Sequence, residues 1–225
     1  MSGVRMFLLS GGSGGIGAAV AAQLAERGYR PVIGYGRNSE AAGEIVRKTG
    51  GMALPLDLTS PASIEAAVSQ LAALEDELAG VLLAGSPPPG LHPYGKMPAE
   101  EMALQWQVNV VGPQLLTAGL VRNCFRRLKR GTVIGVLTKA MGENGQGASS
   151  GMAAYVIAKY GLSGVLAALA AEFPWLKVRS ISPGYTETAM LSAFDPRFLD
   201  LQREKAPFQS AEEVASAILR EIVGS

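Results

Sequence analysis

The chain has 225 residues, of which 48% are hydrophobic, so it is long enough to bury one sizeable core and predicts a single domain over residues 1–225. Its net charge of +1 gives no general attraction to nucleic acid or to an anionic membrane surface. The single cysteine excludes an internal disulfide and a multi-cysteine zinc site, and with one histidine, His92, we expect no metal centre. The N-terminus carries no long apolar segment, so we expect a cytoplasmic protein.

Strand-like and helix-like segments alternate along the chain. Short apolar runs predict strands at residues 5–10, 31–36, 51–56, 80–83, 132–137 and 177–181. Helical patterns fill the gaps, chiefly at residues 18–26, 40–49, 62–78, 99–128, 152–173 and 211–223. This alternation predicts an α/β fold with a single doubly wound, Rossmann-like parallel sheet of about six strands and helices on both faces. Ligands of such sheets bind beyond the carboxyl ends of the strands.

The first predicted strand leads directly into a glycine-rich turn, FLLSGGSGGIG, and an alanine-rich helical pattern follows. Glycines permit the tight turn, let the backbone approach a pyrophosphate, and aim a helix N-terminus at its negative charge. The glycines fit G-x-G-x-x-G through Gly12, Gly14 and Gly17, or [ST]-G-x-x-x-G-x-G from Ser10 through Gly11, Gly15 and Gly17. In this strand–turn–helix context, either pattern predicts a dinucleotide site.

The choice of dinucleotide depends on the residue about twenty positions after the fingerprint. A carboxylate there would bind the ribose 2′-hydroxyl and select NAD. Counting from Gly17 gives Arg37, which Asn38 follows. A guanidinium binds a 2′-phosphate through charge-assisted hydrogen bonds, so we expect NADP(H). The alternative is that Arg37 is an exposed loop charge.

Tyr155 and Lys159 lie four residues apart in a long apolar, alanine-rich run, YVIAK within residues 152–173. On a helix this spacing places both side chains on one face. A nearby ammonium favours phenolate, so we expect Lys159 to lower the pKa of Tyr155 and make it a general acid or base. Chance pairing on a helix is the alternative.

The second glycine pattern together with Y-x-x-x-K resembles the short-chain dehydrogenase/reductase family, including its 3-oxoacyl-carrier-protein reductases. The resemblance covers the chain from Arg5 to about Val223, and the landmarks fall in family order. After the glycine turn these are Asp57, Ala84-Gly85, Asn109 in VNVVG, YVIAK, and SPGYTETAM at residues 182–190.

The resemblance implies a set of cofactor contacts. Asp57 and Leu58 would lie around the adenine, and the SPGYTETAM segment would hold the nicotinamide carboxamide. The implied contacts are Ser10, Gly11, Ser13, Gly15, Ile16, Gly17, Arg37, Asn38, Asp57, Leu58, Ala84, Gly85, Lys159, Pro183, Gly184, Thr186 and Thr188.

The implied catalytic residues are Tyr155, Lys159, Asn109 and Thr138. Asn109 matches the asparagine that supports a proton relay through water in relatives, although an asparagine also satisfies a free carbonyl at a helix kink. Relatives have Ser-Ser where this chain has Leu137-Thr138, and Thr138 retains the hydroxyl. It precedes Tyr155 by 155 − 138 = 17 positions, a few more than is usual, so Ser149 and Ser150 are alternatives.

Two other segments depart from the family pattern. Relatives have Asn-Asn-Ala-Gly where this chain has Leu-Leu-Ala-Gly at residues 82–85, which removes side chains that brace the sheet. The three prolines at residues 87–89 stiffen the following loop, which we expect to wall one side of the site. The chain also stops where relatives add a last strand, so we expect six strands rather than seven.

These observations predict an NADP(H)-dependent reductase or dehydrogenase that acts on a carbonyl, alcohol or acyl thioester. The alternative is a regulatory or structural relative that binds the dinucleotide without turnover. Residues 191–206 are expected to form a substrate lid, whose apolar residues are explained equally by core packing. The Tyr155 helix also carries a narrow stripe of small residues, which are Gly161, Gly164, Ala168 and Ala171. Packing within the monomer is one use of such a stripe, but relatives pair subunits through this helix, so the resemblance implies a homodimer.

Overall fold

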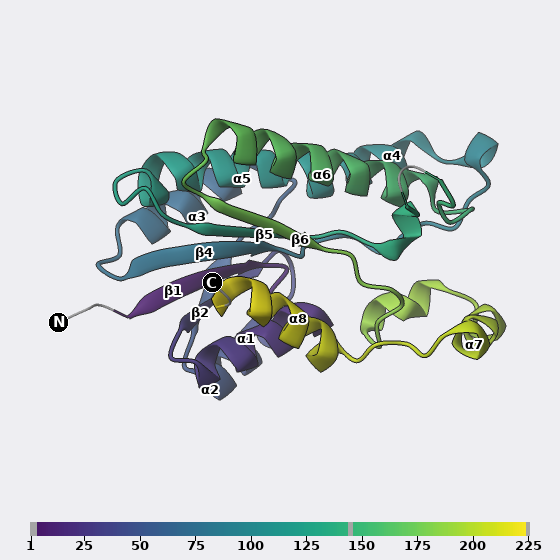
Figure 1. Ribbon diagram of the computed structural model, residues 1–225, viewed down its shortest axis with the longest axis horizontal. Helices are drawn as coiled ribbons and strands as arrows, with labels where there is room; N and C mark the ends of the chain where they lie inside the picture. The colour runs from purple at the N-terminus through teal and green to yellow at the C-terminus, as the bar shows by residue number, and fades with distance from the viewer. Residues whose placement is uncertain (1–3, 144–145, 224–225) are drawn as a thin grey trace.

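The computed structural model describes residues 4–143 and 146–223 (Figure 1). Within them the chain forms a sheet of six parallel strands in the order β3-β2-β1-β4-β5-β6. The strands are β1 (Arg5–Ser10), β2 (Arg30–Tyr35), β3 (Met52–Pro55), β4 (Glu77–Leu83), β5 (Thr132–Val136) and β6 (Lys177–Ile181). The predicted doubly wound α/β fold and its six strands are therefore confirmed.

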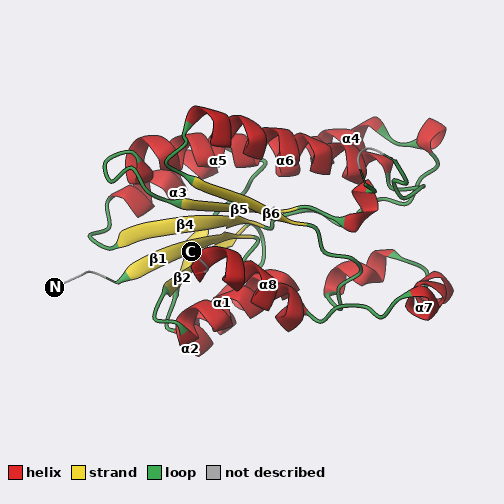
Figure 2. Ribbon diagram, viewed as in Figure 1, coloured by secondary structure: helices red, strands yellow, loops and turns green. Residues whose placement is uncertain are grey.

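Helices cover both faces of the sheet (Figure 2). One face carries α1 (Gly15–Glu26), α2 (Ser39–Thr49) and α8 (Ala211–Val223), and the other carries α3 (Pro61–Ala72), α5 (Gly112–Leu120) and α6 (Ala153–Glu172). Successive side chains of β1 alternate between the two layers, because strand side chains point to opposite faces. Met6 and Leu8 pack under α3, α5 and α6, whereas Phe7 and Leu9 pack against α1 and α8. All four are fully buried, which explains the unbroken apolar run.

The strand order reverses at β1, which pairs with β2 on one side and β4 on the other. Ser10 at the end of β1 pairs with Leu83 at the end of β4. The turns that follow these two strands therefore lie next to each other and then diverge. This is the position at which doubly wound sheets bind ligands.

A continuous helical rod occupies residues 99–125. It consists of α4 (Ala99–Trp106), a π-helical segment (Gln107–Val111), α5, and a second π-helical segment (Val121–Phe125). The predicted helix at residues 99–128 is thus confirmed apart from its last turn. π-Helical turns widen a helix locally and are frequent at functional sites, and the first of them contains Asn109.

Two helices differ most from the sequence-based prediction. Helix α3 ends at Ala72 rather than at residue 78, because Glu77 and Leu78 pair with β1 as the start of β4. Helix α7 (Pro196–Lys205) was missed, although Asp195 caps its first turn and Pro196 occupies its first position. Figure 1 shows α7 set apart from the sheet, beyond the carboxyl ends of the strands.

Among the described helices, α6 is long and apolar enough to cross a membrane by length and composition. Its apolar character has another cause here. The helix packs on β5, β6 and α4, and Leu162, Leu166 and Leu169 belong to the core. It is therefore a core helix of the α/β fold.

Candidate active site

The glycine-rich turn between β1 and α1 is built on close backbone contacts. Gly11 has a φ of +75°, and a Cβ there would lie 2.6 Å from Gly85 Cα. A Cβ on Gly17 would collide with the carbonyl oxygen of Gly11. These glycines hold the turn against the Ala84-Gly85 turn, so the structure brings together the two segments that the sequence assigned to one site.

The N-terminus of α1 fits an anionic ligand. Its N-cap, Gly14, provides no side-chain cap, and the first turn contains no acidic residue. The first N–H groups of a helix lack intrahelical partners and carry a partial positive charge. Because Gly15 and Ile16, the first two helical residues, line the cavity beyond this turn, their N–H groups are available to a pyrophosphate.

Arg37 and Asn38 follow β2 and precede α2. Arg37 is exposed, and its positive charge contributes to holding the pKa of Asp57 below the usual range, after the larger effect of hydrogen bonds from Thr59. Asn38 caps α2 through Oδ1, which accepts a hydrogen bond from the Ala41 N–H at 3.0 Å. Leu58 is 6% exposed and packs in the core.

Tyr155, Lys159 and Thr138 meet at the end of β5. Tyr155 and Lys159 come from α6, and the Lys159 Nζ lies 5.5 Å from the centre of the Tyr155 ring. The Thr138 side chain is near enough to the Tyr155 phenol to lower the pKa of that phenol in part, and its hydroxyl accepts from the Ala140 N–H at 3.1 Å. Thr138, rather than Ser149 or Ser150, is therefore the hydroxyl that the structure places against Tyr155, although Ser149 also lines the cavity.

Burial dominates the ionisation of both residues on α6. It raises the pKa of Tyr155, and the hydrogen bond from Thr138 lowers that pKa in part. The expectation that Lys159 lowers the pKa of Tyr155 below its usual value is thus wrong for this structure, because desolvation of the phenolate outweighs the favourable effects. Burial also lowers the pKa of Lys159 to about 7. The Lys159 Nζ donates a hydrogen bond to the Val136 carbonyl at 2.9 Å.

Asn109 is fully buried in the first π-helical segment. Its Nδ2 donates to the Gln105 carbonyl at 3.1 Å and to Gln105 Oε1 at 3.0 Å. Asn109 therefore does satisfy a carbonyl at a helix distortion, as the alternative interpretation expected. Its Oδ1 is buried without a hydrogen-bond partner among the described residues, which leaves one acceptor for a further donor.

A cavity of about 680 Å³ joins these parts of the site. It is lined by most of the predicted contacts, which are Gly11, Ser13, Gly15, Ile16, Gly17, Ala84, Gly85, Thr138, Tyr155, Lys159, Pro183, Gly184, Thr186 and Thr188. The other predicted site residues lie outside its described lining; they are Ser10, Arg37, Asn38, Asp57, Leu58 and Asn109. Pro88 and Pro89 form one wall, as the sequence predicted.

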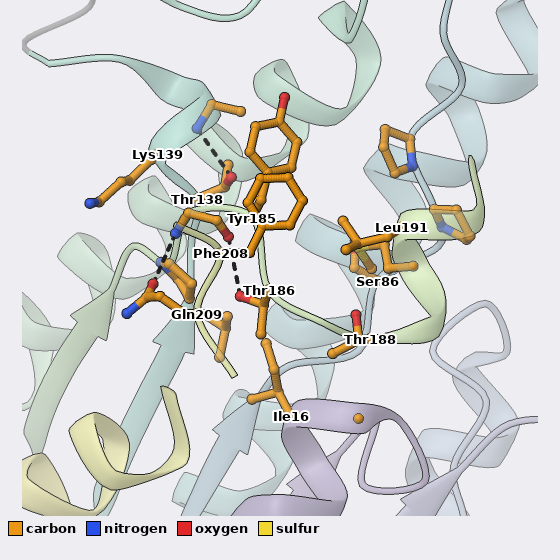
Figure 3. A pocket seen from close by; sticks show the side chains of 18 of the residues that line it. Ile16, Ser86, Thr138, Lys139, Tyr185, Thr186, Thr188, Leu191, Phe208 and Gln209 are labelled. Atoms are coloured by element: carbon orange, nitrogen blue, oxygen red, sulfur yellow. Dashed lines mark hydrogen bonds between the residues drawn. The ribbon is translucent and has the colours of Figure 1, made fainter. Parts of the chain in front are cut away.

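Another part of the cavity wall is aromatic and was only partly predicted; Figure 3 shows Tyr185 and Phe208 side by side in it. Tyr185 stacks on Phe208 with ring centres 5.0 Å apart, and Phe194 meets Tyr185 edge to face. Within the expected lid at residues 191–206, Leu191 and Phe194 line the cavity, whereas Leu199 is buried in packing.

Gln209 fixes this wall to the SPGYTETAM segment. Its Oε1 accepts from the Gly184 N–H at 3.3 Å, and its backbone N–H donates to the Tyr185 carbonyl at 3.0 Å. Three site residues were missed from the sequence: Phe208, Gln209 and the buried Gln105. Each acts through contacts with a distant part of the chain or across a helix, and such contacts leave no periodic pattern in the sequence.

The chain is similar to proteins of known fold and activity. Residues 11–220 match the family described as enoyl-(acyl carrier protein) reductase. The chain is 31% identical over 222 residues to the 3-oxoacyl-[acyl-carrier-protein] reductase FabG of Escherichia coli (strain K12), and the match covers 95% of this chain and 88% of that protein. A 3-ketoacyl-(acyl-carrier-protein) reductase from Brucella melitensis, complexed with NADH, has the same fold with a TM-score of 0.88 at 20% identity, covering 98% of this chain and 91% of that one. BdcA, complexed with NADPH, aligns with a TM-score of 0.81 at 19% identity, covering 99% of this chain and 88% of that one.

A doubly wound sheet with a glycine turn at its switch point and a Tyr–Lys pair beside it defines a class of dinucleotide-dependent oxidoreductases. The chain belongs to the short-chain dehydrogenase/reductase family.

Proposed function

We propose that this protein is an NADP(H)-dependent oxidoreductase that transfers hydride between the nicotinamide and a carbonyl or alcohol, with Tyr155 as the proton donor. The observation that carries the proposal is the meeting of Tyr155, Thr138 and Lys159 at a cavity that extends to the N-terminus of α1. The uncapped helix N-terminus and the close-packed glycines fit a dinucleotide. When bound, the cofactor supplies or accepts the hydride.

The residues of the site then have separate roles. Tyr155 has a raised pKa and is protonated near neutrality, which suits a group that gives its proton to a developing alkoxide. Thr138 donates its single hydroxyl proton to the substrate carbonyl oxygen and so orients the carbonyl. Lys159 holds its ammonium beneath the Tyr155 ring and contacts the ribose, and Asn109 supports the proton relay through its free Oδ1.

The preference for NADP(H) rests on Arg37. Its exposed guanidinium lies at the end of β2, and the N-terminus of α2 begins two residues later. Both features attract a 2′-phosphate, whereas no acidic side chain occupies this position to bind a 2′-hydroxyl.

We infer the domain organisation, the cellular compartment and the substrate class from the sequence features described above and from the relatives. We take residues 1–225 as a single reductase domain with a lid at about residues 191–206, working in the cytoplasm. The substrate is a small carbonyl compound or an acyl thioester, in keeping with the activities of the similar carrier-protein reductases. No nucleic acid or membrane takes part.

Turnover of NADPH against a panel of ketones and acyl thioesters tests the proposal. Tyr155→Phe should reduce kcat by about 10²- to 10⁴-fold while NADPH affinity, measured by fluorescence titration, stays nearly unchanged. Tyr94→Phe is the control, because Tyr94 is 76% exposed and lies outside the cavity lining. Full activity of Tyr155→Phe would show that the mechanism is wrong. NADPH binding without turnover of any panel member would favour the regulatory alternative.

Thr138 provides a second test of the same site. Thr138→Val removes the hydroxyl at nearly constant volume and should cause a large loss of kcat, whereas Thr138→Ser should retain most of it. If Ser149→Ala proves the more damaging change, the orienting hydroxyl belongs to the loop instead.

A further inference from the structure

One face of α4 and of the π-helical segment after it carries Glu101, Gln105 and Asn109 at a spacing of four residues. All three contact, directly or through one another, the loop that follows β4. Glu101 Oε1 accepts from the Gly90 N–H at 2.8 Å, and Glu101 Oε2 lies 3.2 Å from His92 Nε2. This face therefore holds the proline loop, defined here as residues 86–90.

Gln105 is the central member of this face and is 1% exposed. Its Nε2 donates to the Pro88 carbonyl at 2.9 Å and more weakly to the Pro87 carbonyl at 3.5 Å. Prolines have no N–H group, so this stretch of the loop cannot satisfy these carbonyls through its own proline nitrogens. The Pro87 carbonyl accepts from the Ser86 hydroxyl at 3.2 Å, whereas the Pro88 carbonyl receives its donor from Gln105.

The other end of the same amide determines how Asn109 is oriented. Gln105 Oε1 accepts from Asn109 Nδ2 at 3.0 Å, and the Gln105 carbonyl accepts from the same nitrogen at 3.1 Å. Rotating the Gln105 amide by half a turn would face its oxygen to the Pro88 carbonyl and its NH2 group to the Asn109 NH2 group. Only one orientation satisfies both neighbours.

Both Asn109 Nδ2 protons are thus engaged by Gln105. Asn109 Oδ1 is consequently held on the side away from Gln105, as a buried acceptor without a partner among the described residues. Pro88 and Pro89, at the other end of the network, line the cavity. The Gln105 side chain therefore links the proline loop, which lines the cavity, to Asn109, the asparagine of the proposed proton relay.

We propose that Gln105 is a positioning residue for the reaction, which fixes the acceptor of Asn109 and the proline wall relative to one another. This inference rests on the proposed function. Without Gln105, the Asn109 amide is free to rotate, and the Pro88 carbonyl loses its buried donor.

The first test compares Gln105→Leu with Gln107→Leu. Leucine keeps the approximate volume of Gln105 but supports neither hydrogen bond, so kcat should fall about tenfold, the equivalent of one or two hydrogen bonds, while NADPH affinity is retained. Gln107 lies on the same helical rod and makes no side-chain hydrogen bond within the described part of the chain, so its variant should behave as the wild type. An unchanged kcat and pH profile in Gln105→Leu overturns the proposal.

A second variant separates positioning from general stability. In Gln105→Glu the protonated carboxyl still accepts from Asn109 and donates to Pro88, but the ionised carboxyl cannot donate. Activity should approach that of the wild type at low pH and decline as pH rises through the carboxyl pKa, which burial raises. The other titratable groups of this region are Glu101 and His92 by the loop and Tyr155 and Lys159 on α6, so each rate is compared with the wild type at the same pH.

The outcomes distinguish this inference from the function on which it rests. NADPH titration at each pH establishes that the compared samples bind cofactor equally and are folded. A Gln105→Glu profile parallel to that of the wild type, with Tyr155→Phe inactive, overturns the role of Gln105 alone. An active Tyr155→Phe overturns the proposed function itself.

Discussion

Lys159 is fully buried, and its Nζ donates a hydrogen bond to the backbone carbonyl of Val136. Burial disfavours the charged form, and the pKa falls from 10.5 to about 7. The unfolded chain therefore binds more protons than the folded chain between these two pH values. Stability must rise with pH through that window, by up to about 1.4 kcal/mol per pH unit from this group.

Urea unfolding at pH values from about 7 to about 9 tests this consequence. The free energy of unfolding of the wild type should increase over that range, and Lys159→Met should remove the part of the increase due to Lys159. Lys159→Met should also be the more stable protein near neutral pH, because it no longer buries a partly charged group. Equal pH slopes in the two proteins would contradict a lowered pKa for Lys159.

Arg37 carries the prediction on cofactor choice. The wild type should bind NADPH more tightly than NADH, and Arg37→Asp should reverse or abolish the difference. The loss corresponds to one or two charge-assisted hydrogen bonds, each about 1.5–3 kcal/mol. Arg47→Asp, at the other end of α2, makes the same change of charge and should leave the ratio of dissociation constants unchanged. Equal affinity of the wild type for both cofactors would refute the assignment.

At the scale of elements, Arg203 anchors α7 to the rest of the molecule. Its guanidinium lies 4.7 Å from the centre of the Phe208 ring and pairs with Glu187 at 3.2 Å, both outside α7. It also pairs with Asp200 within α7 at 3.1 Å. Exposed ion pairs and cation–π contacts are each worth about 0.5–1 kcal/mol. The anchor is therefore weak enough to open.

Arg203→Ala should raise the KM for the carbonyl substrate several-fold while leaving NADPH affinity unchanged, since the aromatic wall would lose its support. Hydrogen exchange of residues 191–206 should become faster. Arg197→Ala is the matched control, because Arg197 is exposed on the same helix and its side chain has no hydrogen-bond or ion-pair partner among the described residues. If Arg203→Ala and Arg197→Ala changed the KM and the hydrogen exchange equally, Arg203 would have no specific role in anchoring α7.

Some elements were predictable from the sequence because their signals are local. Apolar periodicity and short glycine-rich or polar breaks located the six strands and most helices. The end of α3 was not predictable, because residues 77–79 are equally compatible with a helix until β1 pairs with them. Helix α7 was missed because its composition resembles a polar loop, despite the Asp195-Pro196 start.

Within the candidate active site, too, contacts between residues of one element were predictable and contacts between distant segments were not. Tyr155 and Lys159 share one helix, so their spacing alone predicted that they meet. The stack of Tyr185 on Phe208 joins residues 23 positions apart (208 − 185 = 23), and it depends on how α7 folds back. The raised pKa of Tyr155 was not predictable either, since its cause is burial rather than the neighbouring charge.

At the scale of the whole molecule, the small residues on α6 divide into two groups. A Cβ on Gly161 would meet Trp106 and Val110, so that glycine serves packing within the chain. Gly164 has open space where a Cβ would lie, and Ala168 is exposed beside it. Both line a groove of about 520 Å³ between α5 and α6, which leaves room for another backbone to approach.

We therefore predict a homodimer in which this groove packs against its own copy. Light scattering at micromolar concentration should give twice the chain mass of 23.4 kDa. Ala168→Arg should shift the protein to a monomer, whereas Ala167→Arg, on an exposed neighbouring position outside the groove, should not. A monomeric or tetrameric wild type would contradict the prediction.

The proposed reacting groups at the end of β5 also bear on how relatives of this chain can diversify. Val136, Thr138, Tyr155 and Lys159 all come from one contiguous strand–loop–helix stretch, whereas the aromatic wall is supplied by a separate segment after β6. Exchange of that later segment between relatives would alter substrate choice and leave the chemistry in place. The proline loop can vary less, because any replacement loop must still place a carbonyl where it accepts the hydrogen bond from Gln105. Substrate range should therefore evolve faster on one side of the cavity than on the other.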